Sequence, residues 1–167
     1  AGCLFQTVWN LQAGAEPEIE RYAGDWCRRH LVGYTGMANL ETIGGRIIEV
    51  HLRFADQWPD LYGRGWVEAL IRLYARGDWV FRPYVDRAGY SVVLFMPHGR
   101  SYLYPPGVLL NRVKAIAGVS SVQITFHENM APERHAMPPG GFRVAIVNCW
   151  DLAAGRRARD LLREHFA

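Results

Sequence analysis

Two glutamates, a histidine and an arginine lie close together in the chain, on either side of a Gly-Gly pair. Glu41 precedes Gly44-Gly45, and Glu49, His51 and Arg53 follow it at alternate positions. Carboxylate oxygens are the ligands that Mg²⁺ prefers, and an arginine suits a phosphate oxygen held by the same cation. These residue types are therefore compatible with a magnesium site that could hold a phosphate oxygen.

This chemistry depends on the strands that carry the four residues. Apolar runs at 37–43 and 47–54 flank the Gly-Gly pair, and because glycine accepts positive φ, the pair predicts a hairpin turn. A turn of three or five residues would place Glu41 directly opposite Glu49, about 5 Å apart at Cβ, where a bound cation would relieve their repulsion. A turn of two residues would place the two carboxylates on opposite faces, so the metal hypothesis needs the odd turn.

A half-exposed hairpin with a solvated polar face explains the same alternation of charged and apolar residues. The order of the residues favours a functional interpretation. The runs Asn39-Leu-Glu41 and Glu49-Val-His51-Leu-Arg53-Phe54 resemble the metal-binding end of the ATP-grasp ligases. In that family a first Glu and a later Glu-x-Asn hold Mg²⁺ against the phosphates of ATP, and a following Arg contacts phosphate.

The resemblance implies a role for each residue. Glu41 would be the first metal ligand, Glu49 the bridging ligand and Arg53 the phosphate contact and catalytic residue, while His51 stands at the metal-binding Asn position. It implies ATP and Mg²⁺ as cofactors, with Mn²⁺ as a second possible ion. It also implies a reaction in which a small carboxylate substrate becomes an acyl phosphate that a nitrogen or similar nucleophile captures.

Two features of the family are missing from the sequence. ATP-grasp enzymes carry a nucleotide-binding Lys and a Gly-rich loop before the metal carboxylates, whereas the one lysine of this chain is Lys114. We therefore expect the C-terminal portion of a longer ligase, whose N-terminal part is its partner, and an isolated chain that binds ATP weakly and is inactive. A homo-oligomer is possible.

Composition limits the other classes of function. Half of the 167 residues are apolar and the net charge is +3 without a basic block, which indicates a globular protein and gives little support for nucleic acid. The three cysteines form no Cys-x-x-Cys pair, so we expect no disulfide framework and a cytoplasmic location. The sequence contains no apolar run near the ~18 residues that would cross a membrane.

The remaining pattern predicts an α+β protein with two parts. Residues 1–80 would be the C-terminal part of an ATP-grasp domain, an antiparallel sheet with helices, and residues 81–167 a small mixed α/β domain. Apolar spacing and turn residues predict helices at 17–31, 59–76, 106–117 and 151–166, and strands at 3–11, 90–95, 101–104, 119–126 and 142–149. The strands at 90–95 and 101–104 would form a hairpin around Pro97-His98-Gly99.

Two rival hypotheses remain open. The hairpin could be the scaffold of a non-catalytic structural or interaction domain. A separate metal-binding module could be built from the residues of one polar loop, His127, Glu128, Glu133 and His135, although the loop lacks cysteines and a His-x-x-x-His helix.

Overall fold

The chain divides into two compact units that are not contiguous in sequence. The computed structural model describes residues 8–11, 16–55, 59–81, 88–135 and 141–167. One unit takes residues 1–11 and 87–167, and the other takes residues 12–86. The protein is a mixed α+β protein, but its first strand, β1 (Val8–Leu11), belongs with the C-terminal residues and not with the region that follows it.

The C-terminal unit contains a four-stranded sheet in the order β1-β4-β6-β5, with every neighbouring pair antiparallel. Its other strands are β4 (Gly89–Pro97), β5 (Val119–Ile124) and β6 (Gly141–Cys149). Because both β4 and β5 are antiparallel to β6, they run parallel to each other with β6 between them. Helix α3 (Gly107–Lys114) connects them, which makes a split β-α-β unit.

The same order of strands occurs in ferredoxin-like β-α-β-β-α-β units, with one difference in connectivity. In such a unit the fourth strand follows the second helix in the chain. It pairs with the outer side of the first strand. Here the second helix, α4 (Leu152–Phe166), is the last element, and β1 from the beginning of the chain occupies that edge. The unit is therefore closed by residues from both ends of the sequence.

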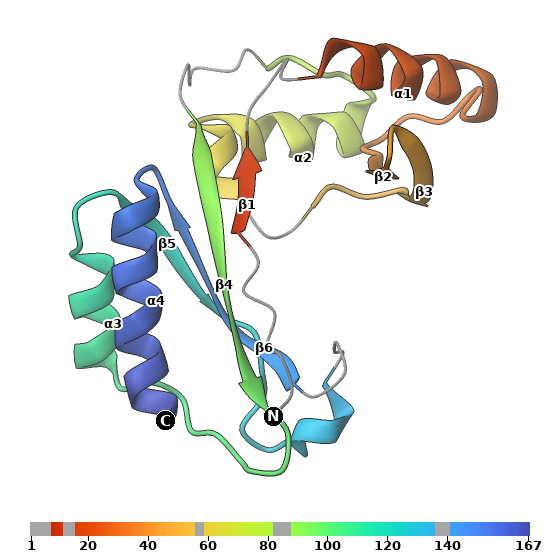
Figure 1. Ribbon diagram of the computed structural model, residues 1–167. Coiled ribbons are helices and arrows are strands. Elements are labelled where there is room, and N and C mark those ends of the chain that lie inside the picture. Colours follow the sequence, from red (N-terminus) through yellow and green to blue (C-terminus); the bar gives the residue numbers. More distant parts are fainter. Residues whose placement is uncertain (1–7, 12–15, 56–58, 82–87, 136–140) are drawn as a thin grey trace. The chain divides into compact units, whose positions relative to one another are not determined.

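Helices α3 and α4 lie beside each other on one face of this sheet (Figure 1), where they enclose the main core. Branched and sulfur-containing side chains of β4 and β6 meet the apolar face of α4. At one end of the core four aromatic rings contact each other. The buried residues of this core include Val92, Leu94, Met96, Tyr102, Val113, Phe126, Phe142, Val144, Val147, Cys149, Ala158, Leu162 and Phe166.

The N-terminal unit has a much smaller core around one tryptophan. It contains helix α1 (Pro17–His30), strands β2 (Asn39–Ile43) and β3 (Arg46–His51), the 3-10 helix η1 (Pro59–Tyr62) and helix α2 (Trp66–Arg76). Trp66 is buried, stacks on Tyr62 with 4.4 Å between ring centroids, and meets Phe54 edge-on at 5.3 Å. No residue of α1, β2 or β3 is buried.

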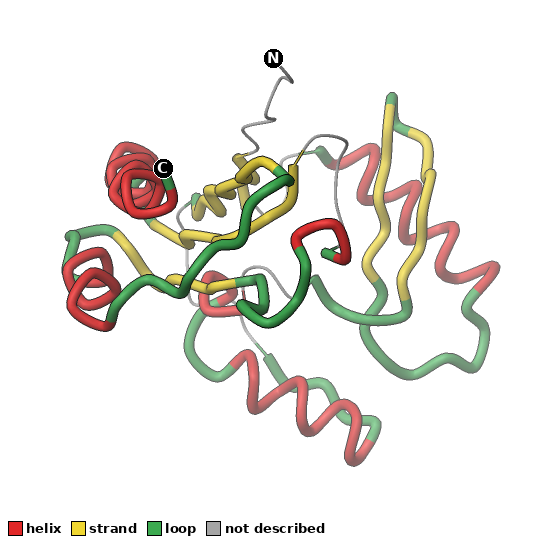
Figure 2. Tube along the Cα trace, turned by 90° about the horizontal axis from the view of Figure 1, so that it is seen from below, coloured by secondary structure: helices red, strands yellow, loops and turns green. Residues whose placement is uncertain are grey.

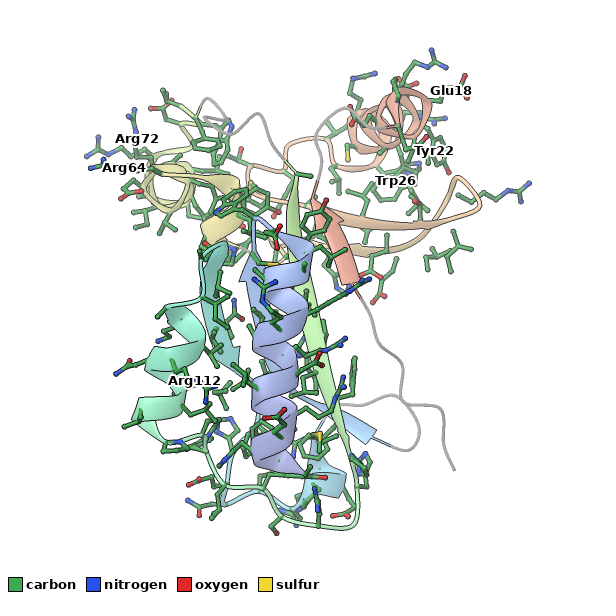
Figure 3. All side chains as sticks on the ribbon, turned by 60° about the vertical axis from the view of Figure 1, so that its left-hand side comes forward. Glu18, Tyr22, Trp26, Arg64, Arg72 and Arg112 are labelled. Carbon is green, nitrogen blue, oxygen red and sulfur yellow. The ribbon has the colours of Figure 1, made fainter. Side chains whose placement is uncertain are left out.

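Helix α1 has the predicted extent and an apolar side with Tyr22 and Trp26 on successive turns (Figure 3). The centroid of the Trp26 ring lies 4.7 Å from that of His30, which is exposed at the end of the helix. Pro17 at the first helical position and the glutamates of the first turn favour this start. No helix in the described part of the chain is long and apolar enough to cross a membrane.

Two predicted elements are wrong. The helix expected from Pro59 begins only at Trp66, because Gly63 and Gly65 have φ of 104° and 87° and interrupt it after η1. The expected strand at 101–104 is irregular chain: the Tyr102 hydroxyl donates to the Pro97 carbonyl at 2.8 Å and its ring enters the core. The strand predicted at residues 3–11 is observed as β1, Val8–Leu11. Its residues 3–7 lie outside the described residues.

Candidate metal site on the hairpin

Strands β2 and β3 form a separate two-stranded sheet, closed by a tight turn (Figure 2). Ile43 pairs with Arg46, so the turn contains only Gly44 and Gly45. Both glycines have positive φ, 56° and 74°, as a type I′ turn requires. The hairpin therefore has the two-residue turn that fits the right-handed twist of its strands, and not the odd turn that the metal hypothesis was expected to need.

A β-bulge restores the arrangement that the turn alone would prevent. Thr42 pairs with Ile47, but Glu41 pairs with Glu49, so Ile48 is one extra residue in β3. Beyond the bulge the pairing continues with Leu40 opposite Val50 and Asn39 opposite His51. Residues that are directly opposed in an antiparallel pair project from the same face. The bulge therefore places Glu49 and His51 on the same face as Glu41.

The three side chains converge on one point of this face. The Nε2 atom of His51 lies 3.1 Å from Oε1 of Glu49 and 3.7 Å from Oε1 of Glu41. One donor atom from each residue lies within 4.8 Å of the other two. The side chain of His51 is 27% exposed and those of Glu41 and Glu49 are 44% and 55% exposed, so a cation held here would keep water or an external ligand in its open positions.

This donor set allows two states. A divalent cation could take one oxygen from each glutamate and Nε2 from neutral His51. Alternatively, protonated His51 is itself the cation between two carboxylates. The same three residues form the group in both states. Only the state with a bound divalent cation would give them a chemical role.

A tyrosine closes the open end of the hairpin beside His51. The Tyr34 hydroxyl lies 2.9 Å from the Met37 carbonyl, just before β2, and 3.3 Å from the Leu52 carbonyl, just after β3. The Met37 amide donates to the Tyr74 hydroxyl of α2 at 3.3 Å. Desolvation is the largest cause that raises the pKa of Tyr34 above its ordinary value. The hydrogen bond with Tyr74 and the charge of Tyr74 raise the pKa further. Tyr34 therefore stays a neutral donor and ties together the two strand ends.

Gly36 makes this contact possible. A Cβ atom at this position would lie 2.4 Å from the Tyr34 hydroxyl oxygen and 2.7 Å from Cζ of its ring. Apolar periodicity and motif spacing did not predict Tyr34, Gly36 or Tyr74 as supports of the site. The available signal was the segment Gly33-Tyr34-Thr35-Gly36, a tyrosine between glycines immediately before the hairpin.

Arg53 lies outside the group of three donors. It follows β3 in a bend, is exposed, and its Nη1 donates to the carbonyl of Phe54 at 3.0 Å. Its predicted contact with phosphate stays a prediction.

The residues of the second predicted metal site have other partners in the structure. Glu133 accepts the Gly99 amide at 3.3 Å, Glu128 accepts the Tyr104 amide, and Nε2 of His135 accepts the His127 amide at 3.0 Å. These bonds hold the loops around the 3-10 helix η2 (Pro132–Arg134). Within the described residues, the group of His, Cys, Asp and Glu side chains with metal-binding spacing is the one on the hairpin.

Comparison of the chain with protein-family models, with curated proteins and with solved structures finds no match.

Proposed function

We propose that the hairpin β2–β3 binds one divalent cation, Mg²⁺ or Mn²⁺, through Glu41, Glu49 and His51. The observation that carries the proposal is the bulge at Ile48, which brings three donor atoms within 4.8 Å on one face of an otherwise plain two-residue hairpin. Two opposed carboxylates without a cation repel each other, so a bound ion would stabilise this arrangement.

The reaction that we propose for this site is ATP-dependent activation of a carboxylate, on the strength of the resemblance to ATP-grasp ligases. A small carboxylate substrate would attack the γ-phosphorus of ATP, giving an acyl phosphate and ADP, and a nitrogen nucleophile would then displace phosphate. The cation would neutralise phosphate charge during transfer, the main form of catalysis in such reactions. Arg53 would contribute a further positive charge to the same phosphates.

The histidine makes this donor set better for Mn²⁺ than for Mg²⁺. Mg²⁺ prefers oxygen ligands, whereas imidazole nitrogen binds first-row transition metals well. We therefore expect Mn²⁺ to bind more tightly, and His51→Asn to reduce this preference by replacing a nitrogen ligand with an amide oxygen.

The competing function is a structural or interaction domain in which His51 alone neutralises the two glutamates. The distance of 3.1 Å between His51 and Glu49 and the exposure of all three side chains are compatible with this ion-pair state. Cation binding distinguishes the two functions, because an ion-pair trio has no need of a metal.

The test is titration calorimetry of the chain with Mn²⁺ and with Mg²⁺, for the wild type and Glu49→Gln. The variant keeps the shape of the side chain and removes one charge, so we expect about 10–100-fold weaker binding. Glu68→Gln, an exposed glutamate on α2, is the matched control and should bind like the wild type. A wild-type chain that binds neither ion, or a Glu49→Gln variant that binds both unchanged, would contradict the proposal.

A further inference from the structure

Asn39 lies next to the three donor residues and offers an oxygen ligand of its own. It is the direct partner of His51 across the hairpin and comes two residues before Glu41 on the same strand. Both relationships place it on the face that carries Glu41, Glu49 and His51, because opposed residues share a face and strand residues alternate with a period of two. Asn39 is half-buried, as is His51.

The backbone around Asn39 is held on both sides. Tyr34 joins the carbonyls of Met37 and Leu52, which come two residues before Asn39 and one residue after His51. The pair Asn39–His51 is therefore the last pair of the ladder before this clamp, and its register is fixed from one side by the clamp and from the other by the pairing of Glu41 with Glu49. The backbone that carries Asn39 is therefore ordered before a ligand binds, which lowers the entropy cost of binding.

We infer that Asn39 is a fourth metal ligand, contributing its amide oxygen to the cation held by Glu41, Glu49 and His51. This inference rests on the function proposed above. Three protein donors leave a six-coordinate Mn²⁺ or Mg²⁺ with three open positions, and a neutral oxygen from Asn39 leaves two, enough for two phosphate oxygens or two waters. Asn39 would then be the one neutral oxygen donor among the four residues that hold the cation.

Mn²⁺ binding by three variants, each compared with the wild type by titration calorimetry, tests the assignment. Asn39→Ala removes the oxygen and should weaken binding about tenfold or more, while Asn39→Asp replaces it with a charged oxygen and should bind at least as tightly as the wild type. Thr42→Ala is the control, because Thr42 lies on the same strand with the opposite parity and should bind like the wild type.

The outcomes separate the inference from the proposed function. A wild type that binds Mn²⁺ while Asn39→Ala binds equally well would overturn the role of Asn39 and leave the three-residue site intact. Weak binding by both Asn39→Ala and Asn39→Asp would show a purely structural role and would also overturn the assignment. A wild type without affinity for Mn²⁺ would overturn both.

A second measurement applies if Asn39→Ala does not fold. The side-chain carbonyl resonance of Asn39 in the wild type is followed by NMR as Mg²⁺ is added, and we expect it to shift. An unchanged resonance would overturn the inference.

Discussion

Gly155 of helix α4 lies against the sulfur of Cys149 on strand β6, so closely that no larger residue fits. A Cβ atom on Gly155 would come within 2.3 Å of the Cys149 Sγ and within 3.0 Å of Cγ2 of Val92. Glycine inside a helix ordinarily destabilises it by about 1 kcal/mol relative to alanine. Here its absent side chain lets α4 approach the sheet.

We expect Gly155→Ala to destabilise the C-terminal unit by about 2 kcal/mol, because overpacking costs more than the gain in helix propensity. Urea denaturation is the measurement. Gly24→Ala in α1 is the control, since a Cβ there meets only Arg28 Nη1 at 3.6 Å, and it should be neutral or stabilising. Adding Cys149→Ala to Gly155→Ala should recover part of the loss, whereas additive losses would contradict the contact.

The Cys149 thiol should stay protonated and unreactive in the folded protein. Burial, with a smaller contribution from the charge of Asp151, raises the pKa of Cys149 to about 11. In a Cys3→Ser background, iodoacetamide at pH 8 should modify half-buried Cys27 much faster than Cys149. Equal rates for the two thiols would contradict the burial.

The same shift predicts a dependence of stability on pH. The folded-state pKa of Cys149 lies above that of an unfolded thiol, about 8.5. The group therefore stabilises the fold fully below pH ~8.5 and loses this contribution as the pH rises towards 11. Between pH 8 and 11 the wild type should lose more stability than Cys149→Ala in urea denaturation. Parallel losses would show that other groups cause the change.

The turn glycines should control the hairpin. Gly44 has φ of 56°, where a Cβ atom costs about 1–2 kcal/mol, so Gly44→Ala should speed amide exchange in β2 and β3. Gly44→Asn should exchange almost like the wild type, because Asn-Gly suits a type I′ turn. Hydrogen exchange is the suitable measurement, since this small sheet can open without unfolding the whole chain. Equal exchange in both variants would argue against the turn.

Arg100 binds the carboxyl end of α4. Its guanidinium donates to the carbonyls of Phe166 and of Ala167, the latter at 2.9 Å, and lies over the Tyr102 ring at 5.1 Å. A cation at this end of a helix meets both the free carbonyls and the negative end of the dipole. Arg100→Ala should lower the free energy of unfolding by about 1–2 kcal/mol in urea titrations. Arg156→Ala, at an exposed position of α4, should change it by less than about 0.5 kcal/mol, and equal effects would rule out the cap.

The sequence predicted the elements whose patterns are local. Helices α1 and α4 and strand β6 have long periodic patterns, and they occur close to the expected residues. The sequence also singled out the three side chains that meet on the hairpin, Glu41, Glu49 and His51, because they alternate around a glycine turn; that they bind a metal stays a prediction.

What the sequence did not predict depends on pairing. A bulge leaves no trace in apolar periodicity, so the extra residue Ile48 was not predicted and an odd turn was considered the only way to place Glu41 opposite Glu49. The pairing of β1 with β4 joins segments far apart in the chain, so β1 was assigned to the wrong half. Tyr102 was taken for a strand residue because its apolar neighbours match one, but its ring packs into the core from irregular chain.

The pairing of β1 with β4 also means that β1 is synthesised well before its partner strand. Leu11 and Gly89 are partners on adjacent strands, so residues 12–88 leave the sheet and return to it at the same place. The ribosome makes β1 first and its partner only after those residues, which takes about 4–15 s at 5–20 residues per second. During that interval β1 lacks its partner strand, and the inserted unit has time to fold before the sheet is complete.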